Sequence, residues 1–132
     1  MEQELKFIFS LNEINKIVNQ IFKFDWQFLL LSGELGVGKT TLVKEIAKKL
    51  NIKETVNSPT FNLMKVYDNL IHIDAYKLSG DLEEFEDFFD DKKVIIEWAE
   101  NIILNTEAKI IKLEILFTDN LDKRIYKIKK VN

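Results

Sequence analysis

The sequence contains no cysteine among its 132 residues, which excludes disulfide bonds and thiolate metal sites. It also has no apolar run near the roughly 18 residues that a membrane-spanning helix needs. The N-terminal stretch MEQELKF lacks the positive region and the apolar segment of a secretory signal. These absences together predict a cytoplasmic protein that does not contact a membrane.

Arginine is almost absent too, because Arg124 is the only one and the remaining basic residues are lysines. The net charge of −3 argues against a protein that coats nucleic acid through bulk positive charge. Charge is unevenly distributed, since residues 81–91 are strongly acidic and residues 123–130 are basic. The simplest interpretation of each of these segments is a charged surface exposed to solvent.

Glycine and proline are also scarce, with four and one respectively, and three of the glycines fall within residues 33–38. Glycine tolerates backbone angles and close approaches that other residues resist, so this cluster indicates a loop built around a ligand. The overall composition, 46% hydrophobic and 31% charged, is typical of a soluble globular protein. The length predicts a single domain over residues 1–132.

Hydrophobic periodicity divides the chain into strands and helices. Ser10 and Glu13 have the spacing of a capping box at the start of the first helix. Segments 61–67 and 70–74 predict a hairpin or two neighbouring strands. Strands are expected at 5–10, 27–32, 61–67, 70–74, 93–97, 110–117 and 124–131, and helices at 11–22, 39–50, 81–89 and 99–104. The pattern predicts a mixed α/β domain with helices on both faces of the sheet.

The segment GELGVGKT matches the phosphate-binding pattern G-x-x-x-x-G-K-[ST] and lies between a buried strand and a helix. Backbone N–H groups of residues 36–40 are expected to converge on phosphate oxygens at the positive end of the helix. Lys39 offers a cation to the β- and γ-phosphates, and the Thr40 hydroxyl can bind Mg²⁺. The predicted nucleotide-binding residues of this loop are Gly33, Glu34, Leu35, Gly36, Val37, Gly38, Lys39, Thr40 and Thr41.

Two acids follow buried strands elsewhere in the chain: Asp74 ends LIHID, and Glu97 ends KVIIE. A phosphate loop needs an acid that holds the metal or activates water, usually at the end of a neighbouring strand. The carboxyl ends of the strands of an α/β sheet form the edge where ligands bind. Both acids are therefore expected to face the loop, and their spacing leaves open which one activates water.

Other polar and aromatic residues near these motifs have both a structural and a functional interpretation. Segment 57–61 is either an ordinary turn around the only proline or a switch that reaches the γ-phosphate. His72 lies in a strand, where a structural histidine is more typical than a catalytic one. Trp98 belongs either to the core or to the wall of the site.

The order of these motifs resembles the TsaE family, the bacterial ATPases required to make threonylcarbamoyladenosine (t6A) in tRNA. GELGVGKTT, SPTF, Tyr67, HIDAYKL and IIEWAE carry the resemblance, which spans roughly residues 27–98. The resemblance implies a three-layer P-loop NTPase domain that hydrolyses ATP weakly with Mg²⁺. It also implies partnership with TsaD and TsaB, which form the modifying enzyme, so that tRNA is met only indirectly through the complex.

Residue by residue, the resemblance assigns Thr40 and Glu97 as the Mg²⁺ ligands. It places Lys39, Asp74 and Glu97 in the hydrolytic machinery, with Asp74 orienting water or a metal-bound water. These assignments fall on the same residues that the loop pattern and the strand ends select.

The resemblance also reaches residues outside the loop and the strand ends. Thr60 resembles the family's switch threonine, and Trp98 its site-lining tryptophan. Ser10 and Arg124 correspond to nucleotide-contacting positions in the flanks. One departure is Lys77, which stands where the family's D-x-Y-R motif has arginine and offers a point charge instead of a bidentate fork.

Two other functions stay open. A small-molecule P-loop kinase would bind the same nucleotide, but such kinases commonly close an arginine-bearing lid, which a single arginine makes hard to build. A nucleotide-dependent interaction module without turnover would use the same residues as a slow ATPase. A GTPase is disfavoured because no guanine-reading N/T-K-x-D motif follows the loop.

The phenylalanines of the acidic segment 81–91 have two interpretations: they dock a partner protein, or they pack in the core.

Overall fold

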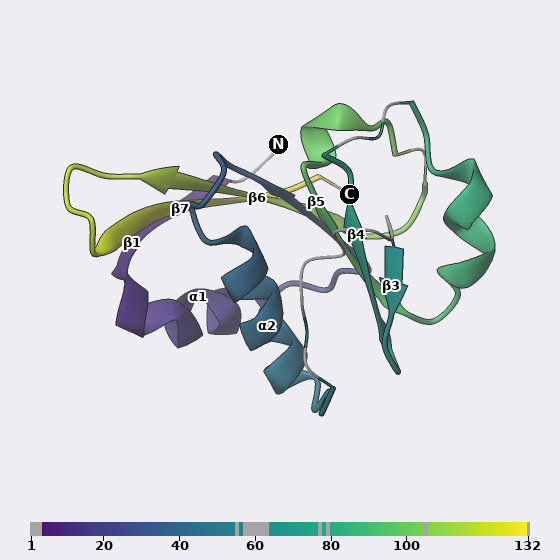
Figure 1. Cartoon of the computed structure of the whole chain (residues 1–132), viewed down its shortest axis with the longest axis horizontal. Helices are drawn as coiled ribbons and strands as arrows, with labels where there is room; N and C mark the ends of the chain where they lie inside the picture. The colour runs from purple at the N-terminus through teal and green to yellow at the C-terminus, as the bar shows by residue number, and fades with distance from the viewer. Residues whose placement is uncertain are drawn as a thin grey trace.

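A computed structural model describes residues 4–54, 56, 64–76, 78, 80–104 and 106–131. Its centre is a seven-stranded sheet with the order β1-β7-β6-β2-β5-β4-β3 (Figure 1). The strands are β1 (Glu4–Ser10), β2 (Phe28–Ser32), β3 (Met64–Val66), β4 (Leu70–Asp74), β5 (Lys93–Glu97), β6 (Ile110–Phe117) and β7 (Lys123–Lys130). Strands β6, β2, β5 and β4 run parallel, while β1, β7 and β3 add antiparallel pairs at the two edges. The mixed sheet and the β3–β4 hairpin confirm the sequence-based prediction.

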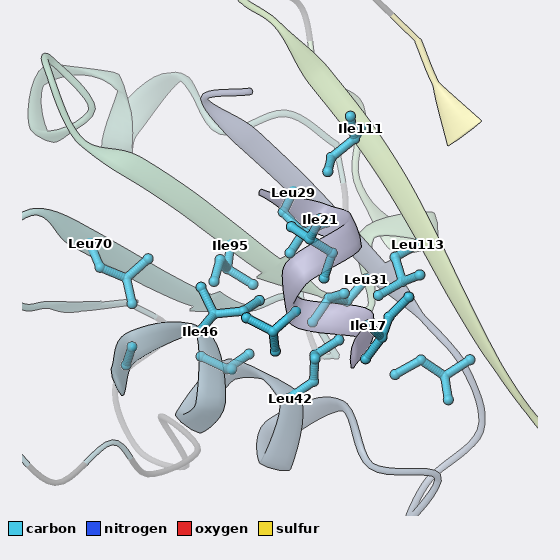
Figure 2. Close-up of a cluster of buried hydrophobic side chains, with 14 of the residues drawn as sticks. Ile17, Ile21, Leu29, Leu31, Leu42, Ile46, Leu70, Ile95, Ile111 and Leu113 are labelled. Atoms are coloured by element: carbon cyan, nitrogen blue, oxygen red, sulfur yellow. The ribbon is translucent and has the colours of Figure 1, made fainter. Parts of the chain in front are cut away.

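Two α-helices, α1 (Ile14–Ile21) and α2 (Lys39–Lys49), pack on the same face of the sheet (Figure 1). Their apolar stripes point at the inner strands, as Figure 2 shows for Ile17 and Ile21 of α1 and Ile46 of α2. Residues of β2 alternate between this core and the opposite one, so the strand is buried on both faces. A continuous apolar sequence such as FLLL is what a strand with two covered faces requires.

The second face of the sheet is covered by shorter helices than the first. The described residues there form two 3₁₀ helices, η2 (Glu83–Phe88) and η3 (Ala99–Asn101), with their connecting chain (Figure 1). Like charges one helical turn apart, such as Glu83 and Asp87, disfavour a regular helix in a segment already too short to be stable alone. The mixed α/β class is confirmed, and the helices that cover the second face are of the 3₁₀ type.

The acidic segment contributes to the core beneath it. Phe89 is buried and Phe85 is partly buried against the second face, whereas Phe88 is exposed. Core packing therefore accounts for two of the three phenylalanines for which docking was the alternative.

The first helix begins as the capping-box prediction requires. The Glu13 carboxylate accepts hydrogen bonds from the Ser10 backbone N–H at 2.9 Å and from its hydroxyl at 2.8 Å. The first turn is a 3₁₀ helix, η1 (Leu11–Glu13), which leads directly into α1. No helix in the described parts of the chain is long and apolar enough to cross a membrane.

Candidate functional site

The glycine-rich loop joins the carboxyl end of β2 to the first residue of α2. Because β2 lies between β5 and β6, the loop emerges at the centre of the sheet edge where the parallel strands end. Gly38 caps α2 with a left-handed φ of 119°, and its carbonyl accepts the first helical hydrogen bond from Leu42. The first N–H groups of a helix have no partner within it, so the end of α2 presents donors and positive potential at this edge.

Gly33 begins the loop where the chain passes very close to β6. A Cβ atom at this position would lie 2.6 Å from the Ile115 carbonyl oxygen and 2.9 Å from a methyl group of Val37. Its φ of +149° adds a conformational reason for glycine. The start of the loop is thus fixed against a neighbouring strand, which leaves little freedom in where the loop lies.

Lys39 is buried, yet its ammonium group is held at the site by polar contacts. It donates hydrogen bonds to the Gly33 carbonyl and, at 3.2 Å, to the Glu34 carbonyl. The ammonium also lies 3.9 Å from the centroid of the Trp98 ring, a cation–π contact. Burial lowers the pKa of Lys39 below its ordinary value, while nearby carboxylates, first that of Glu97, act in the opposite direction.

Thr40 and Glu97 meet although they lie 57 residues apart. The Thr40 hydroxyl lies 3.2 Å and 3.1 Å from the two carboxylate oxygens of Glu97. Glu97 is only 3% exposed and stands in β5 directly beside Leu31 of β2, two residues before the loop. Sheet register therefore carries this acid to the hydroxyl that follows the loop lysine.

His72 is a second partner of Glu97, and sequence reasoning missed this contact. Its side chain is fully buried, and Nε2 lies 2.5 Å from Glu97 Oε2. A usable signal was present, since side chains two residues apart on a strand share a face. His72 therefore shares a face with Asp74, which was already assigned to the site.

Asp74 and Trp98 complete the wall opposite the loop. Asp74 pairs in register with Glu97 across the parallel β4–β5 ladder, and its Oδ1 accepts the Tyr76 backbone N–H at 3.0 Å. Trp98 has a left-handed φ of 58°, and its ring packs against the exposed Tyr76 ring at 4.9 Å between centroids. The two acids at adjacent strand ends thus face the loop, as predicted.

These residues enclose a cavity of about 240 Å³ at the sheet edge. Its lining comes from the loop, the start of α2 and the ends of β4 and β5: Leu35, Gly36, Gly38, Lys39, Thr40, Thr41, Asp74, Glu97 and Trp98. A larger hollow of about 410 Å³ on the second face contains none of the loop residues. The smaller cavity is the candidate site because it combines the helix end, a lysine and two acids, which the larger hollow does not.

Hard oxygen donors at this cavity fit a magnesium ion. The Thr40 hydroxyl and the Glu97 carboxylate are in direct contact, with Asp74 on the same wall. Among the described residues, no group of three or more histidines and acids is arranged to hold a metal unaided. Mg²⁺ suits such a pair, since it is usually bound by one or two protein ligands together with water and phosphate oxygens.

The single arginine reaches the loop from β7. Arg124 is buried, and its Nε donates to the Val37 carbonyl at 3.1 Å. One terminal nitrogen donates to the Leu121 and Lys123 carbonyls at 2.9 Å each, and the guanidinium carbon lies 4.7 Å from the centre of the Phe117 ring. Its distance from the loop in sequence is therefore no guide to its position in space.

A family comparison matches residues 8–125 to the model described as "Threonylcarbamoyl adenosine biosynthesis protein TsaE". The chain belongs to the TsaE family. This assignment confirms the resemblance drawn from the motif order.

Individual members of the TsaE family agree with this assignment. The Streptomyces coelicolor protein, named as a tRNA threonylcarbamoyladenosine biosynthesis protein TsaE, is 38% identical over 74% of this chain and 66% of its own length. The Rickettsia typhi protein of the same name is 36% identical over 79% of this chain and 78% of its own length. A crystal structure of Bacillus subtilis YdiB superposes with a TM-score of 0.77 and 26% identity, covering all of this chain and 88% of that one.

For three residues named with the TsaE resemblance, the described part of the chain shows no contact with the candidate cavity. Ser10 forms the capping box at the start of η1, and within the described residues its hydroxyl contacts Asn12 and Glu13. Thr60, like the rest of the expected switch at 57–61, lies outside the described residues, as does Lys77. Their roles stay predictions.

Proposed function

We propose that this chain binds Mg-ATP at the loop and hydrolyses it slowly, as an ATPase required for t6A formation in tRNA. The observation that carries the proposal is the meeting of Lys39, Thr40 and Glu97 at the positive end of α2, in one cavity. A cation and a hard-oxygen pair at a helix N-terminus are the groups that a bound triphosphate requires. Family membership supplies the link to t6A.

The proposed roles follow from the positions of the side chains. The loop N–H groups and Lys39 bind the β- and γ-phosphates, and Thr40 and Glu97 hold Mg²⁺. When bound, the ion supplies charge neutralisation on the transferring phosphate. Asp74, fixed by the Tyr76 N–H, orients the attacking water and accepts its proton as the bond between the γ-phosphorus and its bridging oxygen breaks.

Asp74 is favoured over Glu97 as the group that meets water. Glu97 is 3% exposed, and its carboxylate already contacts His72 and Thr40. Asp74 lies only partly buried on the cavity wall. A base must reach water and the substrate, which the more accessible acid does more easily.

The position of Arg124 disfavours the kinase alternative. Among the described residues, the Arg124 hydrogen bonds go to the backbone carbonyls of Val37 in the loop, Leu121 and Lys123, and its guanidinium packs on Phe117. A buried side chain committed in this way is not part of a mobile lid. The same arrangement leaves transition-state charge incompletely neutralised, which fits slow turnover by the isolated chain.

We propose further that the chain acts with TsaD and TsaB and contacts tRNA only through them. The net charge of −3 argues against strong binding of tRNA by this chain alone. Two large apolar side chains are exposed at the mouth of the cavity: Leu35 on the loop, 81% exposed, and Tyr76 against Trp98, 57% exposed. A partner that covers them would sense the occupancy of the adjacent cavity.

The test measures phosphate release from ATP and from GTP by the purified chain, with and without TsaD and TsaB. We expect slow basal hydrolysis, a preference for ATP, a rate that changes when the pair is added, and association that depends on the nucleotide. Lys39→Ala is the control that should lose hydrolysis at this site. Leu35→Ser tests the proposed contact surface and should weaken association with the pair.

t6A formation by this chain alone, measured by mass spectrometry of the tRNA, would overturn the proposal. Nucleotide binding without any turnover, alone or in the complex, would favour the interaction module.

A further inference from the structure

His72 is the only histidine of the chain, and the roles proposed above do not use it. It stands in the middle of β4, between β3 and β5, with no exposed surface. A fully buried polar ring is costly unless it is hydrogen-bonded, and its partner in the structure is a carboxylate of the candidate metal site. The burial of this side chain therefore indicates a role beyond core packing.

The contacts of Glu97 supply that reason. Its Oε2 lies between His72 Nε2 at 2.5 Å and the Thr40 hydroxyl at 3.1 Å, while among the described residues Oε1 has the hydroxyl at 3.2 Å. The terminal torsion of a glutamate is broad, so a carboxylate with one mobile partner can rotate easily. A ring fixed on a neighbouring strand removes that freedom by holding Oε2.

The surroundings of the ring also define its tautomer. A carboxylate only accepts hydrogen bonds, so the ring proton that faces Glu97 sits on Nε2. Nδ1 has no hydrogen-bond partner among the described residues. A proton on Nε2 therefore has an acceptor among the described residues, whereas a proton on Nδ1 has none there.

We propose that His72 is a positioning residue that orients Glu97 for Mg²⁺. Its Nε2–H holds Oε2, so that Oε1, beside the Thr40 hydroxyl, would be available to bind the cation. The inference rests on the proposed Mg-ATP site and adds a determinant of its metal affinity. Removing the hydrogen-bonding partner of a metal ligand typically weakens metal binding by roughly 10–100-fold.

The experiment compares His72→Leu, His72→Gln and Leu70→Ala by calorimetry of ATP binding, in EDTA and across a Mg²⁺ titration. In His72→Leu the Mg²⁺ concentration that half-maximally enhances ATP binding should rise by roughly tenfold or more. ATP affinity in EDTA should be unchanged. His72→Gln, whose amide can donate to Glu97, should restore most of the Mg²⁺ response. Leu70→Ala damages the same face of β4, where Leu70 is equally buried, and should leave the Mg²⁺ response intact.

The outcomes separate this inference from the proposed function. Wild-type protein that binds no ATP, or binds it without response to Mg²⁺, defeats the proposed function itself. Wild-type protein that responds to Mg²⁺ while His72→Leu responds equally overturns only the role of His72. That role is also overturned if Leu70→Ala shifts the Mg²⁺ response as much as His72→Leu does.

A spectroscopic test on the wild-type protein covers the case in which His72→Leu does not fold. Because the chain has a single histidine, its ring nitrogens give unambiguous ¹⁵N signals. We expect a protonated Nε2 whose resonance moves when Mg²⁺ is added to the ATP complex and moves much less when ATP is added in EDTA. An Nδ1–H tautomer, or a signal that Mg²⁺ leaves in place, would overturn the inference.

Discussion

The two walls of the candidate cavity are built in opposite ways. The loop wall comes from one short stretch, within residues 35–41, and much of its chemistry lies in the backbone and in one lysine. The strand-end wall is assembled from Asp74, Glu97 and Trp98, which come from the ends of β4 and β5. The loop wall therefore has a shape suited to holding phosphates, and the strand-end wall has the carboxylates for metal and water. Substitutions on the two walls should separate binding from hydrolysis.

The largest effect is expected on the strand-end wall. Asp74→Asn and Glu97→Gln should each lower ATP hydrolysis by roughly 10²–10⁴-fold, because each removes a carboxylate at the reacting groups. Glu97→Gln should also raise the Mg²⁺ requirement, since an amide is a poorer ligand for a hard cation. Asp74→Asn should leave that requirement close to the wild-type value. Phosphate release across a Mg²⁺ series measures both effects.

Glu107→Gln is the matched control for these acids, because Glu107 is an exposed carboxylate outside the cavity lining. It should hydrolyse ATP at the wild-type rate. Normal turnover with normal Mg²⁺ dependence in both acid variants would contradict a role of Asp74 and Glu97 in hydrolysis.

On the loop wall, Lys39→Ala should weaken ATP binding by roughly 10–100-fold, the usual cost of losing hydrogen bonds to a charged group. Calorimetry measures the affinity directly. Lys44→Ala is the control, because Lys44 lies on the same helix with an exposed side chain outside the cavity lining. Unchanged affinity in a folded Lys39→Ala protein would contradict the assignment of the loop.

Gly33→Ala tests how firmly the loop wall is fixed to the sheet. The new methyl group would meet the Ile115 carbonyl and Val37, so we expect a loss of about 1–3 kcal/mol in the free energy of unfolding. Gly80→Ala is the control, because Gly80 also has a positive φ, +83°, but a Cβ atom added there would meet no atom within 4 Å. Denaturant unfolding of both proteins isolates the contact from the backbone strain. Equal losses would show that the close approach to β6 has no energetic weight.

The smallest effect is expected at Arg124. Arg124→Lys keeps a positive charge but loses the Nε hydrogen bond to Val37, so ATP affinity should fall by less than about tenfold, near 1 kcal/mol. Lys123→Ala, an exposed neighbour, should bind ATP normally. A loss as large as that of Lys39→Ala would mean that Arg124 touches the nucleotide itself.

The success of sequence reasoning differed between local and long-range features. The capping box at Ser10, the buried strand β2 and helix α2 were predicted close to their observed bounds, because each depends on residues adjacent in the chain. The acidic segment was predicted as a helix without a statement of its type, and it forms a 3₁₀ helix. Its like charges one turn apart disfavour a regular α-helix there.

The sequence by itself determined the loop, since GELGVGKT places its glycines, lysine and threonine within one strand–loop–helix unit whose geometry is local. It also selected Asp74 and Glu97 as acids that end apolar strands. Only the tertiary structure decided that Glu97 meets Thr40 and His72, and that Arg124 reaches Val37 from β7. These contacts depend on which strands are neighbours and in which register they pair. Strand order is set by the packing of the whole sheet, which no short stretch of sequence encodes.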